Sequence, residues 1–283
     1  VSIDGLGEIE SAVIGIGNGK KVKIIDAINY PDSIGLVYKG ITDYLGFDHR
    51  TSQGTVMALA AYGNYNEKLK NNNSYYKEFK KIIKISKDGK FSIDKSYFNY
   101  PYKLEGWVSD KFIKLFGKRR NKKSKLEKRH KDIAAALQKR FEDAYLSFIK
   151  RAQNLTQLKT LTLSGGCALN CKANGEIIKK TNFKDIYIQP ACGDNGLCIA
   201  AAHLAEIDGL VEHPATGQHQ HDEDRGNFWH EHQSHLVNLG NGLHDTDERT
   251  DHQGSQEQRA TDDCHRQECL LAPQDRFTDV HLE

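Results

Sequence analysis

The stretch that decides the fold is residues 158–205, which read LKTLTLSGGCALNCKANGEIIKKTNFKDIYIQPACGDNGLCIAAAHLA. Two β-type runs, 158–163 and 185–189, are each followed by a glycine turn and then by a helical pattern, over 168–180 and 195–205. Parallel strands need a crossover connection, and two strand–helix units in so short a stretch supply it. The sequence therefore predicts an α/β fold.

Upstream of this stretch, the pattern continues to alternate. Residues 11–16 and 21–25 are β-branched runs around Gly-Asn-Gly-Lys at 17–20, which predicts a hairpin. Asp32 and Ser33 are candidate N-caps for a helix over 34–45. This half of the chain therefore predicts a strand hairpin followed by a helix.

Three further segments complete residues 1–205. A short helix is expected over 52–61, and the longest amphipathic helix over 126–153. Residues 64–125 carry an Asn-, Lys- and Tyr-rich part with strand-like pieces such as 81–85. We interpret 64–125 as an insertion or a peripheral part of the domain.

Charge divides the chain near residue 205. Residues 1–205 hold 35 Lys and Arg against 20 Asp and Glu, whereas residues 206–283 hold 5 Arg, no Lys and 18 Asp and Glu. Ten of the 13 histidines also lie beyond 205, and 19 of those 78 residues are apolar. Such a segment buries too little apolar surface to offset its ordering entropy. Two interpretations stay open: an unstructured tail, or a frame-shifted segment outside the native reading frame.

Composition excludes several classes of protein. No run of 18 apolar residues exists, so a membrane-spanning helix is not expected, and no secretory signal pattern occurs at the start. Six cysteines are too few for a disulfide scaffold and favour a cytoplasmic location. Val1 in place of Met indicates that the true N-terminus is missing.

Two glycine turns follow the strands of 158–205. Ser164-Gly165-Gly166-Cys167-Ala168-Leu169-Asn170 allows backbone amides to approach an anion at a helix start, or it is a tight turn that binds nothing. Asp194, in the second turn (residues 189–196), is either a helix cap or a metal or phosphate ligand at a strand end. Asp4, which follows the first apolar run, has the same two interpretations.

Other chemistry-bearing residues favour structural roles. Cys167, Cys171, Cys192 and Cys198 do not complete a zinc pattern and are expected to be small buried residues. Nine Lys and Arg in residues 118–131 lack interleaved aromatic residues, which favours a solvated loop and helix start over a nucleic-acid site. The His-x-His pairs at 219–221 and 230–232 have no helix to fix a metal geometry.

Six segments together resemble the O-carbamoyltransferase family of nodulation and antibiotic-modifying proteins. They occur in the order of the family and cover most of residues 1–205; they are VSIDGLGE (1–8), SIGLVYKGITDYLGF (33–47), VMALAAYG (56–63), RHKDIAAALQ (129–138), LSGGCALNCKANGEI (163–177) and IYIQPACGDNGLCIAAA (186–202). The resemblance implies a partial domain of the actin, sugar-kinase and Hsp70 fold, which is RNase H-like.

The resemblance also implies a reaction and a site. Family members use ATP and a small-molecule carbamoyl donor, carbamoyl phosphate, to make carbamoyl-adenylate, and pass the carbamoyl group to the hydroxyl of an acceptor such as a sugar or natural product. Asp4 and Asp194 correspond to ligands of a divalent metal, iron or magnesium. Gly165, Gly166 and Asn170 correspond to the nucleotide-binding turn. The apolar pattern predicts no membrane partner, and the basic segment does not favour a nucleic-acid partner.

Departures from the family leave alternatives open. Two histidine motifs of the family, expected ahead of Val1, and its adenylate-forming second domain, expected after 205, have no counterpart here. The chain thus corresponds to the later part of the transfer domain, and we expect this truncated chain to be inactive alone. The alternatives are a threonylcarbamoyl-transfer protein acting on tRNA, a kinase of the same superfamily, and a non-catalytic nucleotide-binding remnant.

Overall fold

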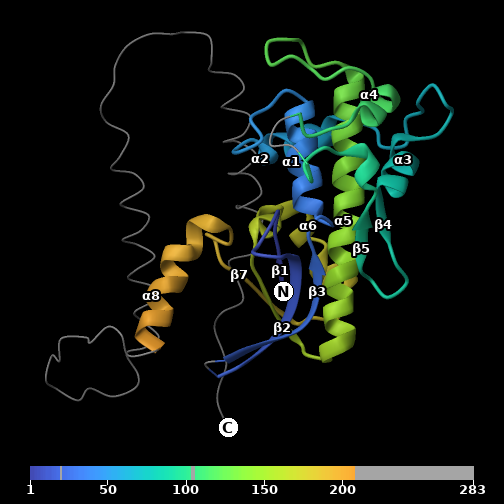
Figure 1. Ribbon diagram of the computed structural model, residues 1–283. Helices are drawn as coiled ribbons and strands as arrows, with labels where there is room; N and C mark the ends of the chain where they lie inside the picture. Colours follow the sequence, from blue (N-terminus) through green and yellow to red (C-terminus); the bar gives the residue numbers. More distant parts are fainter. Residues whose placement is uncertain (20, 103–105, 208–283) are drawn as a thin grey trace, which may run out of the picture. The chain divides into compact units, whose positions relative to one another are not determined.

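A computed structural model describes residues 1–19, 21–102 and 106–207 of the chain (Figure 1). The chain divides into two units, Val1–Leu204 and Ala205–Glu283. The acidic segment 206–283 was predicted to lack a packed core. Apart from the end of one helix, this segment lies outside the described residues. The α/β class predicted for the rest is confirmed.

Five strands carry the candidate site. The first three are antiparallel neighbours, β1 (Ser2–Ile3), β2 (Glu10–Asn18) and β3 (Lys21–Asn29). The other two, β6 (Thr160–Leu163) and β7 (Asp185–Ile188), are parallel, with Thr160 opposite Asp185. Both the hairpin around residues 17–20 and the parallel pairing predicted for 158–205 are confirmed.

A parallel bridge between Ser2 and Ser164 joins the two sets of strands. The Ile3 N–H donates to the Ser164 carbonyl and the Ser164 N–H donates to the Val1 carbonyl, both at 3.0 Å. The order of strands is therefore β3-β2-β1-β6-β7. Because β1, β6 and β7 are parallel, the turns that follow them lie at one edge.

The longest helix, α5 (Lys128–Thr156), is the centre of the packing. Figure 1 shows it beside α1 (Ile34–Tyr44), α6 (Cys171–Asn174) and β4 (Ile83–Ile85), and it also packs on α2 (Gln53–Leu59). The apolar stripe predicted for this helix is buried throughout; it comprises Ile133, Leu137, Phe141, Ala144, Tyr145, Phe148 and Ile149. The long amphipathic helix is thus confirmed as a core element.

The remaining elements complete the described fold. The part between residues 64 and 125 contains α3 (Tyr75–Ile82), β4 paired with β5 (Phe91–Ile93), and α4 (Asp110–Phe116). The α3 helix packs on α5, and the Arg140 guanidinium of α5 donates to the Ile83 carbonyl at 2.7 and 2.8 Å. The short 3-10 turns are η1 (Ala60–Tyr62), η2 (Lys95–Tyr97), η3 (Gly166–Leu169) and η4 (Asp194–Gly196).

Two predictions of local structure were wrong. The helix expected over 168–180 is divided into η3, α6 and α7 (Ile177–Lys180), because Asn170 caps a new helix at Ala173 and Gly175 ends it. The strand-like piece 81–85 begins at Ile83, since the apolar face of α3 continues through Ile82 into the core. The last helix, α8 (Leu197–Ile207), agrees with its prediction.

None of the helices in the described part of the chain is both long enough and apolar enough to cross a membrane.

Candidate functional site

Asp4 lies at the end of β1, where three segments meet. Its Oδ2 accepts the Gly166 N–H at 3.0 Å, and its Oδ1 accepts the Gly5 N–H at 2.6 Å. The Asp4 carbonyl accepts the Ser33 hydroxyl at 3.2 Å, and the same Ser33 oxygen caps α1 by accepting the Leu36 N–H. The Asp4 residue therefore links the end of β1 to the start of α1 and to the first glycine turn.

The first glycine turn, Ser164–Asn170, requires glycine at its second position. Gly165 has φ +87°, and a Cβ on it would lie 2.3 Å from the Ile3 carbonyl oxygen. Its N–H donates to the Cys192 carbonyl at 2.7 Å, which ties the first turn to the second. Gly165 thus serves close backbone packing between β1 and the turn.

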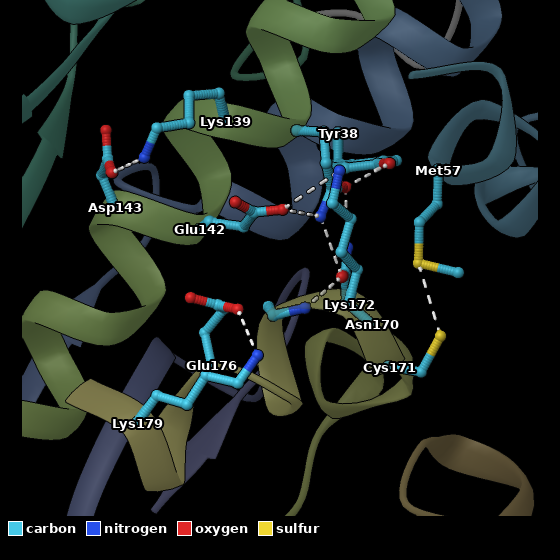
Figure 2. Close-up of polar contacts among 12 residues, drawn as sticks. Tyr38, Met57, Lys139, Glu142, Asp143, Asn170, Cys171, Lys172, Glu176 and Lys179 are labelled. Atoms are coloured by element: carbon cyan, nitrogen blue, oxygen red, sulfur yellow. Dashed lines mark hydrogen bonds and ion pairs between the residues drawn. The ribbon is translucent and has the colours of Figure 1, made fainter. Parts of the chain in front are cut away.

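A buried network of polar side chains holds the other end of the first turn (Figure 2). Gln138 of α5 and Asn170 exchange two hydrogen bonds, each 3.0 Å long. Gln138 also accepts the Tyr38 hydroxyl and donates to Glu142 Oε1, both at 2.9 Å. Only 1% of the Gln138 surface is exposed, so these four bonds satisfy the whole amide group.

This network changes what Asn170 is expected to do. Its Oδ1 accepts the Ala173 N–H in addition to Gln138 Nε2, and the residue is buried. The side chain therefore positions the turn and begins α6. A direct contact of Asn170 with a nucleotide stays a prediction, as do nucleotide contacts from Gly165 and Gly166, whose N–H groups are committed to Cys192 and Asp4.

Sequence reasoning missed Gln138, Tyr38 and Glu142. The one available signal was Gln138 itself, an uncharged polar residue directly beside the apolar stripe of a long helix. A buried amide there needs partners, because an unpaired buried polar group costs about 1–3 kcal/mol. The partners come from residues 100 positions upstream and 32 downstream, a distance that local patterns do not span.

The second glycine turn lies against the first. A Cβ on Gly193 would be 3.6 Å from the Gly166 Cα, and Gly166 in turn donates to Asp4. Asp194 follows Gly193, is exposed, and opens η4 (Asp194–Gly196). The structure thus brings the loops that carry Asp4 and Asp194 to the same glycine, while a shared metal between their carboxylates stays a prediction.

The four cysteines near the turns divide into two pairs. Cys167 and Cys192 are buried, as expected, whereas Cys171 and Cys198 are exposed, which corrects the expectation for these two. Burial raises the pKa of both buried thiols, and the negative charge of Asp4 raises it further. These two thiols are therefore protonated at neutral pH and are not nucleophiles.

The described residues do not form a complete metal site. Among them, no three His, Cys, Asp or Glu side chains come together in a way that would hold a metal ion. Both Asp4 oxygens already accept backbone N–H groups. Asp4 and Asp194 would supply at most part of a ligand set and would need further ligands from outside this group. The histidine pairs at 219–221 and 230–232 lie outside the described residues.

The basic segment 118–131 is partly internal. Arg120 is buried and donates to the Leu45 carbonyl at 2.5 Å, and Arg119 pairs with Asp43 at 2.6 Å. Lys128 begins α5 and pairs with Asp132 at 2.8 Å. The expected helix start is present. The loop before it is not fully solvated, because Arg119 and Arg120 bind residues at the end of α1.

A comparison with known protein families shows which family the chain belongs to. The family model described as "Carbamoyltransferase N-terminus" matches residues 1–203, which is most of the chain. The chain belongs to this carbamoyltransferase N-terminal family. The matched residues include β1, both glycine turns and the Gln138–Asn170 pair, so the site described above lies wholly within the family region.

Relatives within curated proteins agree with this assignment. An uncharacterized protein of Synechocystis is 36% identical over 203 residues, covering 71% of this chain and 31% of that protein. Nodulation protein NolNO of Sinorhizobium fredii is 29% identical (71% and 27% covered), and NolO of Bradyrhizobium diazoefficiens is 27% identical (73% and 34% covered). The chain therefore spans about a third of the length of the curated relatives it matches.

Proposed function

We propose that the chain is part of an ATP-dependent O-carbamoyltransferase, which moves a carbamoyl group from carbamoyl phosphate through carbamoyl-adenylate to a hydroxyl group. Membership of the carbamoyltransferase N-terminal family supports transfer of a carbamoyl group. The observation that supports nucleotide binding is the contact between the two glycine turns at Gly166, whose N–H Asp4 accepts. Glycine turns at strand ends are a common way to bind phosphate.

The order of strands supports a fold proposal. Three antiparallel strands followed by two parallel ones, in the order β3-β2-β1-β6-β7, is the arrangement that we assign to the RNase H-like half of an actin or sugar-kinase domain. In such a sheet, ligands bind beyond the carboxyl ends of the parallel strands. Asp4, Gly166 and Asp194 all follow such ends.

Each residue then has a proposed role. Gly166 has no side chain and is partly exposed, which leaves room for a phosphate group to approach the turn. Asp4 holds the Gly166 N–H and fixes the direction of that amide. Asn170 and Gln138 fix the far end of the turn. Asp4 and the exposed Asp194 are the candidates for part of a divalent-metal ligand set.

The proposed transfer step needs only carbamoyl-adenylate and the acceptor. The acceptor hydroxyl oxygen attacks the carbamoyl carbon of carbamoyl-adenylate. The bond from that carbon to the phosphate oxygen breaks, and AMP leaves with the bonding electron pair. The hydroxyl proton is lost to solvent or to a nearby base, and the product is the O-carbamoyl ester. In this step, Asp4, Asn170 and Gln138 would hold the glycine turn that binds the nucleotide in position.

Because the chain alone is expected to be inactive, the test joins it to the remaining segments of a full-length member of the family and supplies ATP, carbamoyl phosphate, Mg²⁺ or Fe²⁺ and a mixed pool of hydroxyl acceptors. Release of AMP that depends on carbamoyl phosphate, together with a carbamoylated acceptor in the mass spectrum, supports the proposal. Release of ADP with a phosphorylated acceptor would identify a kinase instead. Saturable ATP binding without turnover would identify a nucleotide-binding remnant.

A matched variant keeps this test specific. Gly166→Val places a side chain beside Asp4, since a Cβ would lie 3.2 Å from Asp4 Oδ1, and it blocks close approach of a phosphate. We expect ATP binding to fall by about tenfold or more, at a similar melting temperature. Unchanged ATP affinity in this variant would remove the turn from the nucleotide site.

A further inference from the structure

The single methionine of the chain lies beside an exposed cysteine. Met57 belongs to α2 and Cys171 is the first residue of α6, so 114 positions separate them. Figure 2 shows the two side chains pointing toward each other, with 4.0 Å between Cys171 Sγ and Met57 Sδ. Neither residue has a role in the proposed nucleotide site, so the pair is a feature that the proposed function does not use.

The core holds the backbones that carry the two sulfur atoms. Val56 and Leu59, which flank Met57, are buried, and α2 packs on α5. At the other end, the buried side chain of Asn170 caps α6, whose first residue is Cys171. The short separation of the two sulfur atoms is therefore set by packing and by a helix cap.

The distance between the sulfur atoms suits one metal ion between them. With metal–sulfur bonds of about 2.3 Å, two sulfur atoms 4.0 Å apart subtend an angle of about 120° at the metal. Such an angle is that of a trigonal site, whose third position is free for a water or a small thiol. Cys171 is exposed and Met57 is half-buried, so an ion can reach the pair from solvent.

The donor atoms select the kind of ion. A thiolate and a thioether are soft ligands that favour Cu(I), whereas Mg²⁺ and Ca²⁺ require oxygen ligands. Structural Zn²⁺ needs four ligands, and among the described residues no three His, Cys, Asp or Glu side chains come together to hold a metal. A thiolate and Cu(I) also cancel each other's charge, so the bound ion leaves no net charge beside the half-buried Met57.

The other cysteines near the turns do not offer the same chemistry. Cys167 and Cys192 are buried, and burial raises the pKa of both thiols, so they keep their protons at neutral pH. Cys198 is exposed, but its Sγ donates to the Asn195 carbonyl at 3.6 Å, and the chain has no second methionine to pair with it. Among the described residues, Cys171 alone combines an exposed thiol with a thioether partner.

We propose that Cys171 and Met57 form a binding site for a single Cu(I) ion. Cys171 binds as a thiolate and releases its proton to solvent, and the Met57 thioether binds through a lone pair on its sulfur. The bound ion links α2 to the start of α6. The site goes beyond the proposed carbamoyl transfer and shares no residue with the proposed nucleotide site, so each can fail without the other.

An anaerobic competition titration with Cu(I) tests the site. The full chain carries Cys264→Ser and Cys269→Ser, because these two cysteines lie outside the described residues and offer further thiols to the ion. A chromophoric Cu(I) chelator reports how much of the ion the protein removes. We expect one equivalent of Cu(I) to bind, and an excess of Zn²⁺ to leave this binding unchanged. Displacement of Cu(I) by Zn²⁺ would overturn the assignment of the ion.

Two variants and a matched control show which atoms bind. Met57→Leu keeps an apolar side chain of similar volume and removes the sulfur, so it should weaken Cu(I) binding by about tenfold or more at a similar melting temperature. Cys171→Ser should abolish binding of this equivalent. Cys198→Ser removes the other exposed thiol of this region and should bind normally. Unchanged binding by Met57→Leu would reveal a lone thiol in van der Waals contact with a methionine, and it would overturn the proposal, as would an equal loss in Cys198→Ser.

Alkylation gives a second readout at single residues. One equivalent of Cu(I) should protect Cys171 from iodoacetamide and leave Cys198 as reactive as before, with the labelled sites assigned by peptide mass spectrometry. In Met57→Leu, the protection of Cys171 should be lost at the same chelator concentration. Equal protection of both cysteines, or protection of neither, would contradict a specific site at Met57.

Discussion

The two glycine turns look alike in the sequence and differ in the structure. Each follows a parallel strand and precedes a helix, and each contains a glycine whose substitution would collide with backbone. In the first turn, the collision is with a distant strand, since a Cβ on Gly165 would meet Ile3. In the second, it is local, because a Cβ on Gly196 would lie 1.9 Å from the Ala191 carbonyl oxygen.

Side chains reinforce this difference. Asn170 ends the first turn inside a buried network with Gln138, whereas Asp194 and Asn195 of the second turn are exposed. The first turn is therefore held by residues from three other elements, and the second mainly by itself and by the Gly165–Cys192 hydrogen bond. We infer that the first turn is the rigid side of the candidate nucleotide site and the second is the adaptable side.

The largest expected effect comes from Gly165→Ala. The residue has φ +87°, and its new Cβ would lie 2.3 Å from the Ile3 oxygen, so β1 must move away from β6. We expect the free energy of unfolding to fall by about 4 kcal/mol, measured by chemical denaturation. In the second turn, the Cβ of Gly193→Ala would make ordinary contacts at 3.5 Å or more. This variant should change the free energy of unfolding by less than about 1 kcal/mol. Equal losses would remove the contrast between the turns.

Gln138→Leu should have the next largest effect. It leaves Asn170 and the Tyr38 hydroxyl without their buried partner, which should cost about 3 kcal/mol of unfolding free energy. Gln153→Leu on the same helix is the control, because Gln153 accepts a single hydrogen bond, from the Asn182 N–H at 3.1 Å, and should cost about 1 kcal/mol or less. Gln138→Leu and Asn170→Leu should be strongly non-additive in a double-mutant cycle. Additive effects would show that the network does not act as a unit.

The sequence predicts the elements better than it predicts the links between them. The hairpin, the N-cap of α1 and the apolar stripe of α5 follow from local patterns of turn residues and apolar spacing, and the structure has them. The glycine turns could also be located, since each stands between a strand and a helix. The Gln138–Asn170 pair and the contact of Gly165 with Ile3 could not, because their partners are 32 and 162 positions away.

The same limit explains the errors around Asn170 and the cysteines. Asn170 lies in a helical pattern, and only its tertiary partner shows that it ends one turn and caps the next helix. Cys171 follows the buried Cys167 by four residues and Cys198 follows the buried Cys192 by six, yet both are exposed. Spacing alone does not say which face of a short helix meets the core.

The smallest expected effect is a local opening of the second turn, read by thiol labelling at pH 8. Cys171 and Cys198 should react rapidly with iodoacetamide, whereas burial and raised pKa values protect Cys167 and Cys192. Gly196→Ala should cost only about 1–2 kcal/mol, because an exposed turn can shift, and it should accelerate labelling of Cys192 but not of Cys167. Peptide mass spectrometry assigns the sites. Joint exposure of both thiols would mean that the turns open together.

The most direct test of the central claim is a titration of the isotope-labelled chain with MgATP, followed by backbone amide NMR. The account predicts saturable shifts at residues 164–170 and 192–196, with the larger increase in order in the second turn. Gly166→Val should abolish the shifts in both turns without altering the spectrum of α5. Saturable ATP binding that leaves both turns unperturbed, or shifts that persist in Gly166→Val, would contradict the claim that the two turns at Asp4 form the nucleotide site.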